Sequence, residues 1–209
     1  EGARPDVEQQ FPYYPFNYRA GWGYMMLTYG LPAQGNGVYK IHAIAYDKEG
    51  NNVELGVKTI TCDNAHATKP FGTIDVPGQG GTVSGSSYVN FGWALTPQPK
   101  MIPLDGSTIW VTIDGEYLGH PVYNNYRQDI ATSFPGYANS NGAVGYYYID
   151  TTKYANGVHT IGWLVTDNGG AADGIGSRFF TVLNAGTGSG ADLGMLSPFW
   201  LSSHKDNDY

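Results

Sequence analysis

The sequence contains an internal repeat whose two copies differ in length. Residues 4–12 (RPDVEQQFP) resemble residues 127–135 (RQDIATSFP), and residues 36–64 resemble residues 156–184 further along the chain. The spacing falls from 123 to 120 between these two matches, so the first copy holds three extra residues, which loops accommodate at low cost. Self-similarity at a fixed spacing is typical of chains built from repeated structural units.

The second copy is preceded by a long stretch that has no counterpart before the first. Residues 65–126 contain two segments in which apolar residues alternate with others, at 88–95 and 108–113. We therefore expect a complete unit over residues 65–184. Residues 1–64 are expected to form only the C-terminal half of another unit.

The alternating pattern predicts β-strands that each bury one face. Val89, Phe91, Trp93 and Leu95 fall on one side of the first such strand. Turn sequences then predict hairpins at residues 157–182, at the equivalent residues 37–62, and around Asp114-Gly115. A short helix is expected only at residues 127–134, and Cys62 is expected to be a small core residue.

Composition and charge limit the classes of function that are open to this chain. The chain has 209 residues, enough for a sizeable core, and only 14% of them are charged. Its net charge of −7, with no basic block, argues against nucleic acid as a partner. No apolar run approaches the ~20 residues that span a membrane. The single cysteine allows no intrachain disulfide.

The expected localisation follows from composition. The chain starts at Glu1 without a signal-peptide pattern. Its low lysine content and its many Tyr, Thr, Asn and Gly residues are typical of exported bacterial β-proteins. We therefore expect an extracytoplasmic location, which means the periplasm, the cell surface or the medium.

In their order along the chain, several short motifs resemble a bacterial immunoglobulin-like repeat of large exported proteins. The resemblance covers residues 69–184 well and residues 4–64 in part. It implies an all-β, seven-stranded immunoglobulin-like sandwich that acts as a spacer, adhesion or docking module, with no catalytic residues. The motifs are PFGTID (70–75), GGTVSG (80–85), VTIDG (111–115), FPGY (134–137), NGVHTI (156–161) and TDNGG (166–170).

Half of a sandwich would expose apolar surface and unpaired strand edges. Something must cover it, and the sequence leaves two sources open. One is an upstream segment of a longer chain, and the other is a partner that supplies the missing strands.

The C-terminal residues 185–209 begin with a flexible Gly-Thr-Gly-Ser-Gly linker and continue into an apolar stretch. We expect this stretch to dock onto a protein partner, because Met and aromatic side chains are enriched in interface cores. Trp22 and Tyr24 in the first copy are expected to contribute as well. The predicted partner-binding residues are Trp22, Tyr24, Met195, Leu196, Phe199, Trp200 and Leu201.

Other chemistry has little support in the sequence. Glu116, Asp150, Asp167 and Asp173 are the carboxylates that a glycosidase pair or a calcium site would use, but Asp167 and its repeat mate Asp47 are expected to cap turns. The five histidines are scattered and form no metal-binding motif. We therefore expect no catalytic residue, cofactor or metal.

The sequence thus predicts a non-enzymatic structural or interaction protein that docks onto a larger assembly. A carbohydrate-binding or adhesion module is the alternative, because aromatic rings can stack on sugars. On a strand, Tyr146 and Tyr148 point to one side and Tyr147 to the other, so at most two of these rings would face outward together.

Overall fold

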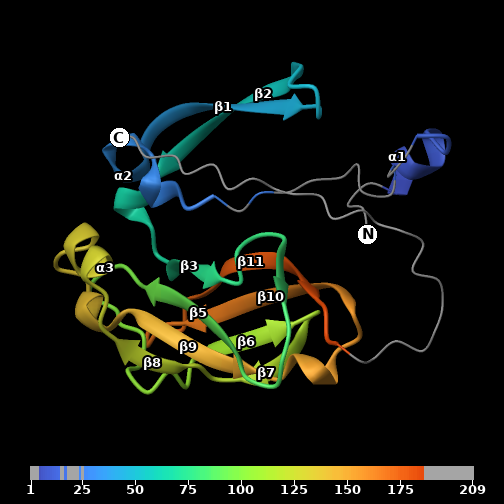
Figure 1. Ribbon diagram of the computed structural model, residues 1–209. Coiled ribbons are helices and arrows are strands. Elements are labelled where there is room, and N and C mark those ends of the chain that lie inside the picture. Colours follow the sequence, from blue (N-terminus) through green and yellow to red (C-terminus); the bar gives the residue numbers. More distant parts are fainter. Residues whose placement is uncertain (1–4, 15–16, 18–23, 25, 186–209) are drawn as a thin grey trace.

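The computed structural model describes residues 5–14, 17, 24 and 26–185. Most of them form a β-sandwich, and a separate two-stranded hairpin lies over it (Figure 1). One sheet of the sandwich has five strands in the order β4-β11-β10-β6-β7, and the other has four in the order β3-β5-β9-β8. The strands of the sandwich are β3 (Phe71–Val76), β4 (Gly81–Val83), β5 (Tyr88–Leu95), β6 (Ile109–Ile113), β7 (Glu116–Gly119), β8 (Val122–Asn125), β9 (Val144–Ile149), β10 (Gly157–Thr166) and β11 (Ala172–Val182).

The strand order is that of an immunoglobulin sandwich. The β3-β5-β9-β8 sheet corresponds to strands A, B, E and D, and β11-β10-β6 correspond to G, F and C. The predicted all-β immunoglobulin-like fold is therefore confirmed. The expected count of seven strands is wrong, because β7 extends the second sheet beyond β6 and β4 pairs in parallel with β11.

The main core lies between the two sheets. It is filled mostly by β-branched side chains, which pack well on pleated surfaces. Trp163 on β10 crosses this core, and its indole Nε1 donates a 2.8 Å hydrogen bond to the side-chain oxygen of Asn90 on β5. Asn90 in turn donates to the carbonyl of Val76, so this fully buried amide is satisfied on both sides.

Strand β5 departs from the prediction that each strand buries one face. Its alternate residues Asn90 and Ala94 belong to the main core or its edge, while Trp93 and Leu95 are buried on the opposite side. They join a second apolar cluster with Ile130 of helix α3 (Gln128–Ser133). The second half of β5, from Gly92 to Leu95, is therefore buried on both faces.

Among the described residues, the two six-residue helices lie at equivalent places in the repeat. Helix α3 confirms the short helix expected at residues 127–134. A second helix, α1 (Pro5–Gln10), was not predicted, because its six residues are mostly polar and too few to show a period. It precedes α3 by the 123 residues that separate the two copies, and in both copies the phenylalanine that follows donates a backbone hydrogen bond four residues back.

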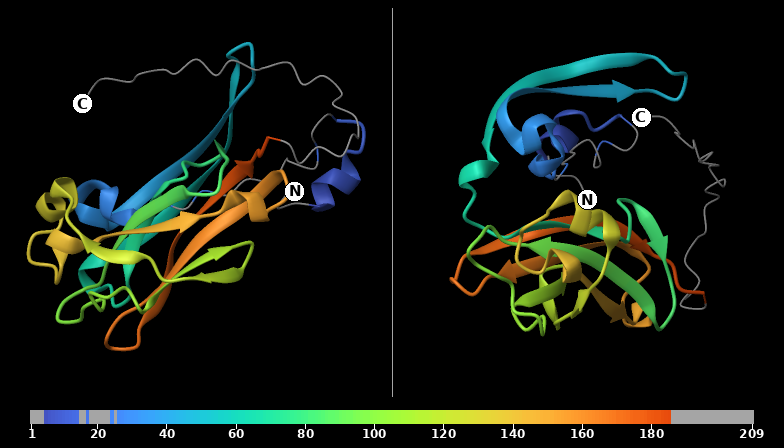
Figure 2. Two further views of the ribbon diagram at one scale, coloured as in Figure 1. Left: turned by 60° about the horizontal axis from the view of Figure 1, so that its bottom comes forward. Right: turned by 90° about the vertical axis from the view of Figure 1, so that its left-hand side faces the viewer.

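The hairpin of β1 (Asn36–Tyr46) and β2 (Asn52–Asp63) forms a two-stranded sheet of its own outside the sandwich. Figure 2 shows it arching over the sandwich and joined to it at one end. None of the helices in the described ranges is long and apolar enough to cross a membrane. The short helical turns are η2 (Thr28–Gly30), α2 (Pro32–Gly35), η3 (Asn64–His66), η4 (Ser140–Gly142) and η5 (Thr151–Lys153).

Candidate interaction surface

The β1–β2 hairpin has the same geometry as the β10–β11 hairpin of the sandwich. Gly37 pairs with Cys62 in the first and Gly157 with Val182 in the second, both displaced by 120 residues. Each hairpin also shifts register at one place, after Ala43 in β1 and after Trp163 in β10. The residues left unpaired there, Leu55 and Ile175, are equivalent bulge residues.

The same side-chain caps hold both hairpins. The carboxylates of Asp47 and Asp167 accept backbone N–H groups four residues ahead, at 2.8 and 3.0 Å, so both Asp turns predicted from the sequence are confirmed. At the base, the hydroxyl of Thr28 donates to the side-chain oxygen of Asn64 at 3.0 Å. Thr151 and Asn184, the equivalent pair, make the same bond at 2.8 Å.

Asp167 is the more buried of the two turn carboxylates. Burial by itself raises the pKa of Asp167, but hydrogen bonds from Thr96 and from backbone N–H groups outweigh burial and leave this pKa lowered. The carboxylate is therefore a structural cap whose acceptor sites are in use.

The surroundings of the two hairpins differ. In the sandwich, β6 pairs with the free edge of β10 and β4 pairs with the free edge of β11. Among the described residues, β1 and β2 pair only with each other. Two edges that are covered in the second copy are thus open in the first.

Side-chain exposure follows from this difference. Leu55 is 57% exposed, whereas its equivalent Ile175 is 3% exposed in the main core. Cys62 is only partly buried, whereas Val182 is fully buried, so the expected core position for Cys62 is wrong. The apolar side chains of the hairpin that are more than 40% exposed are Val38, Ile44, Tyr46, Val53, Leu55 and Val57; Val38 is the exception to this contrast, because its equivalent Val158 is also exposed in the complete unit.

An aromatic joint fixes the base of the hairpin to the sandwich. The ring of Tyr29 in η2 stacks on Phe71 at the start of β3, with centroids 4.0 Å apart and planes 18° from parallel. Phe134 and Tyr137 close around the same pair. Burial, together with a hydrogen bond that the Tyr29 hydroxyl donates to Tyr137, raises the pKa of the Tyr29 phenol. The contact between these aromatic residues was not predicted from the sequence. The one sequence difference that marks it is that the second copy has Thr152 at the position equivalent to Tyr29.

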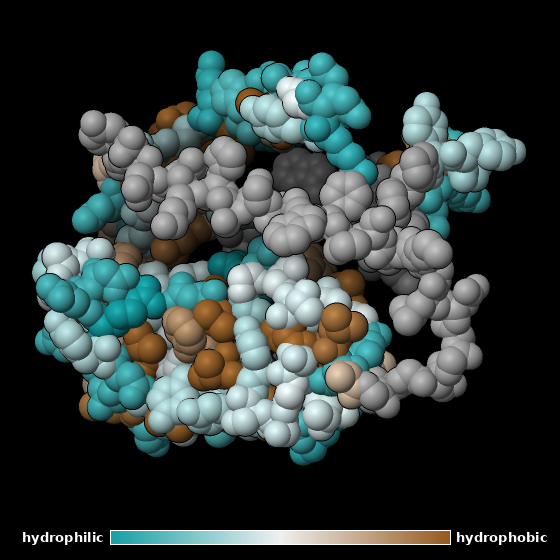
Figure 3. Space-filling view, viewed as in Figure 1, coloured by the Kyte–Doolittle hydropathy of each residue, from teal (hydrophilic) through white to brown (hydrophobic). Residues whose placement is uncertain are grey.

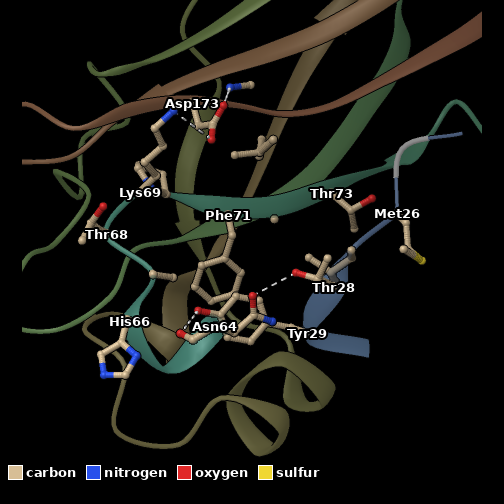
Figure 4. Close-up of a pocket in the computed structure, with 16 residues that line it drawn as sticks. Met26, Thr28, Tyr29, Asn64, His66, Thr68, Lys69, Phe71, Thr73 and Asp173 are labelled. Atoms are coloured by element: carbon tan, nitrogen blue, oxygen red, sulfur yellow. Dashed lines mark hydrogen bonds and ion pairs between the residues drawn. The ribbon is translucent and has the colours of Figure 1, made fainter. Parts of the chain in front are cut away.

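A cavity of about 440 Å³ opens beside this joint (Figure 4). Tyr29 and Phe71 face each other along one part of its wall, and Lys69 and Asp173 form an ion pair of 3.6 Å at another. The other polar side chains along the wall include Thr28, whose hydroxyl donates to the side-chain oxygen of Asn64 at 3.0 Å, and His66, whose ring is 2.8 Å from the carboxylate of Asp63.

Of the predicted partner-binding residues, only Tyr24 lies in the described part of the chain. Its side chain is 78% exposed and lines a second cavity of about 600 Å³ with Ile74, Arg178 and Phe179 among others. An exposed aromatic ring above apolar and cationic groups is compatible with a contact surface. The residues that lie outside the described residues are Trp22, Met195, Leu196, Phe199, Trp200 and Leu201.

Three of the four candidate carboxylates, Asp150, Asp167 and Asp173, are engaged in local interactions. Asp150 accepts from the backbone N–H of Thr152, and Asp173 pairs with Lys69. Within the described ranges, no three His, Cys, Asp or Glu residues come together in a way that could hold a metal ion.

The tyrosines of β9 are divided as predicted. Tyr147 turns toward the core, and its hydroxyl donates to the carbonyl of Leu118 at 3.0 Å. Tyr146 and Tyr148 lie on the outer face with ring centroids 5.7 Å apart, but their planes meet at 76°. Two rings at this angle do not form one flat platform.

Apolar side chains also gather on the sandwich face seen in Figure 3.

Comparison with known proteins gives distant structural likenesses. No protein-family model matches the sequence, and no curated protein sequence matches it. Among solved structures, the chain is similar to the fibronectin(III)-like modules of Clostridium thermocellum CbhA, with a TM-score of 0.37, 19% identity, and coverage of 75% of this chain and 68% of that one.

Two further solved structures are similar over shorter stretches. The endo-beta-1,4-mannanase from Thermotoga petrophila has a TM-score of 0.36 and 11% identity, over 58% of this chain and 21% of that one. CopC from Methylosinus trichosporium OB3b has a TM-score of 0.32 and 13% identity, over 55% and 95%. The fold assignment rests on the strand order, and these likenesses add nothing about function.

Proposed function

We propose that this chain is a non-enzymatic interaction module that docks onto a larger extracytoplasmic protein assembly. Its residues 65–184 act as a rigid immunoglobulin-like body, and residues 1–64 act as the C-terminal half of a second unit. The observation that carries the proposal is the contrast between Leu55 and Ile175, which are 57% and 3% exposed in equivalent bulges.

Exposed apolar side chains and two open strand edges favour association, because pairing removes apolar area from water and satisfies backbone groups. Recognition by strand addition uses this combination of open edge and apolar face. The tail residues 195–201 remain a second proposed contact.

A photo-cross-linking experiment in the producing cells tests this function. A benzoylphenylalanine placed at Ile44, which is 49% exposed on β1, should capture one partner reproducibly. The matched control is Leu164 on β10, which pairs with Trp110 of β6 and should cross-link within the chain. If the probe at Ile44 captures no partner beyond the level seen at Leu164, the docking function is wrong.

A carbohydrate-binding module is the second candidate. It is favoured by Tyr148, which is 60% exposed beside Tyr146 on the outer face of the sandwich. A glycan-binding screen of the parent and of Tyr148→Ala separates the two functions. Binding that Tyr148→Ala abolishes would support the module, and equal binding by the two proteins, or no binding by either, would remove it.

A further inference from the structure

We propose that the β1–β2 hairpin is completed by the N-terminal half of another unit of this repeat, carried on a partner polypeptide. The inference rests on the proposed function and names the partner that it requires. The chain itself supplies the template, because its second copy shows how residues 69–126 cover the equivalent hairpin.

The first part of the template is the pairing of β6 with β10. Ile113, Val111 and Ile109 lie opposite Ile161, Trp163 and Val165 in an antiparallel ladder. All six side chains are at most 2% exposed. On the first hairpin, the equivalent positions in β1 are Ile41, Ala43 and Ala45, which are only half-buried.

The second part is the parallel pairing of β4 with β11. Val83 lies opposite Val182, and both side chains belong to the main core. The equivalent of Val182 is Cys62, so the partner strand should place an apolar side chain beside this thiol.

The third part of the template is the packing of β3, in the facing sheet, against β11. In the second copy, a Cβ on Gly176 would come within 3.2 Å of the backbone nitrogen of Ile74, so β3 packs closely against β11 there. Gly56 is the equivalent residue, and among the described residues no atom lies within 4 Å of the place its Cβ would take. Within the described part of the chain, nothing over β2 fills the space that β3 fills in the complete unit. A single added strand would cover an edge and leave this space open, so a half-unit fits better than one peptide strand.

The side chains of the hairpin indicate which residue types the partner should have opposite them. Ala43 and Ala45 replace the larger Trp163 and Val165, so the side chains of β6 and β5 would fit over this hairpin without a clash, and larger side chains in the partner would fill the space that remains. In the second copy, the carboxylate of Asp114 accepts the backbone N–H of Thr160 at 2.8 Å. Lys40 takes the place of Thr160, so an acidic residue at this turn of the partner gains a cationic neighbour.

The single cysteine of the chain makes the pairing register measurable. The probe is a separate polypeptide with the sequence of residues 65–126 and the substitution Val83→Cys, added to the full chain with a short bifunctional thiol reagent. The matched control is the same polypeptide with Thr82→Cys, because Thr82 pairs one position away, with Thr181. We expect Val83→Cys to cross-link to Cys62 at least tenfold more than Thr82→Cys.

Two further measurements distinguish specific strand pairing from non-specific cross-linking of the thiols. Leu55→Asp in the full chain should reduce the cross-link about tenfold, whereas Tyr46→Asp, at a 69% exposed position near the turn, should leave it unchanged. Addition of the unsubstituted probe should also slow hydrogen exchange at His42 and Ile44. Equal cross-linking of the two cysteine probes, or unchanged exchange, would overturn the proposal.

The outcomes also separate this inference from the proposed function. If the photo-probe at Ile44 captures a partner that lacks the sequence pattern of residues 69–126, the inference is wrong and the docking function stands. If it captures no partner, both are wrong.

Discussion

Leu55 and Ile175 are the bulge residues of two hairpins that share register, turn caps and basal hydrogen bonds, yet Leu55 is 57% exposed and Ile175 is 3% exposed. The local structure of the two copies is therefore the same, and the difference comes from what packs on them. In the second copy β3, β4 and β6 cover the hairpin. In the first, the described part of the chain leaves it open.

This pair gives the first prediction, on stability. Ile175→Ala should lower the free energy of unfolding by about 2–5 kcal/mol, because it removes buried methyl groups from a packed core. Leu55→Ala should change it by less than about 0.5 kcal/mol in the chain alone, because the side chain is mostly in water. Urea unfolding followed by tryptophan fluorescence measures both. A loss for Leu55→Ala as large as that for Ile175→Ala would show that the hairpin is already covered.

The second prediction concerns the buried hydrogen bond between Trp163 and Asn90. Asn90→Leu leaves the indole N–H and the carbonyl of Val76 without their partner in the core. We expect a loss of about 2–3 kcal/mol in the free energy of unfolding. The double variant with Trp163→Phe should lose less than the sum of the two single variants, since one orphaned donor is then removed. Strict additivity in urea unfolding would contradict this role of the bond.

The third prediction is a pH dependence at the β6–β7 turn. Burial lowers the pKa of His159, but its 2.6 Å hydrogen bond with the Asp114 carboxylate, with a further bond to the Ala155 carbonyl, outweighs burial and leaves the pKa raised. A raised pKa in the folded state stabilises the fold fully below the unfolded value of about 6.5 and loses this effect as the pH rises through the folded value.

Asp114→Asn is the variant that tests it. The parent should exceed this variant in stability by more at pH 6 than at pH 8, and the gap should be below about 1 kcal/mol because the pair is partly open to solvent. Chemical denaturation at the two pH values measures the gap. A gap that is equal at both, or larger at pH 8, would contradict the assigned pair.

The fourth prediction concerns the aromatic joint. Tyr29→Ala removes the ring that stacks on Phe71, so the segment between the hairpin and the sandwich should open more often. Hydrogen exchange across residues 64–70 should then quicken about tenfold. Tyr117→Ala, at a 61% exposed position on β7, is the matched control and should leave that segment unchanged. Unchanged exchange in Tyr29→Ala would show that the joint does not hold the hairpin.

The parts of the fold that could be predicted from the sequence are those that depend on residues a few positions apart. The Asp-Gly turn at 114–115 and the alternation in β10 predicted hairpins that the structure has, because turn residues and the two-residue period act within a few positions. The repeat predicted that residues 37–62 and 157–182 form the same element. Transferring α3 along the repeat would also have found α1.

Other features depend on contacts between distant residues. The double burial of β5 follows from α3 packing on its outer face, and alternation on that strand gave no sign of it. Strand β4 has three residues in a glycine-rich stretch and exists because β11 pairs with it. The joint between Tyr29 and Phe71 links segments on either side of the hairpin, so no local pattern marks it.

Residue-resolved hydrogen exchange on the full chain tests the central claim most directly. In the second copy the N–H of Thr166 donates to the carbonyl of Thr108, directly before β6, at 3.0 Å. The two-residue ladder period places the amides of Gly162 and Leu164 on the same covered edge. Their equivalents on β1 are His42 and Ile44. The account predicts exchange at His42 and Ile44 at least about 100-fold faster than at Gly162 and Leu164 in the chain alone. Equal protection at the two pairs of amides would contradict it, because the edge of β1 would then already be covered.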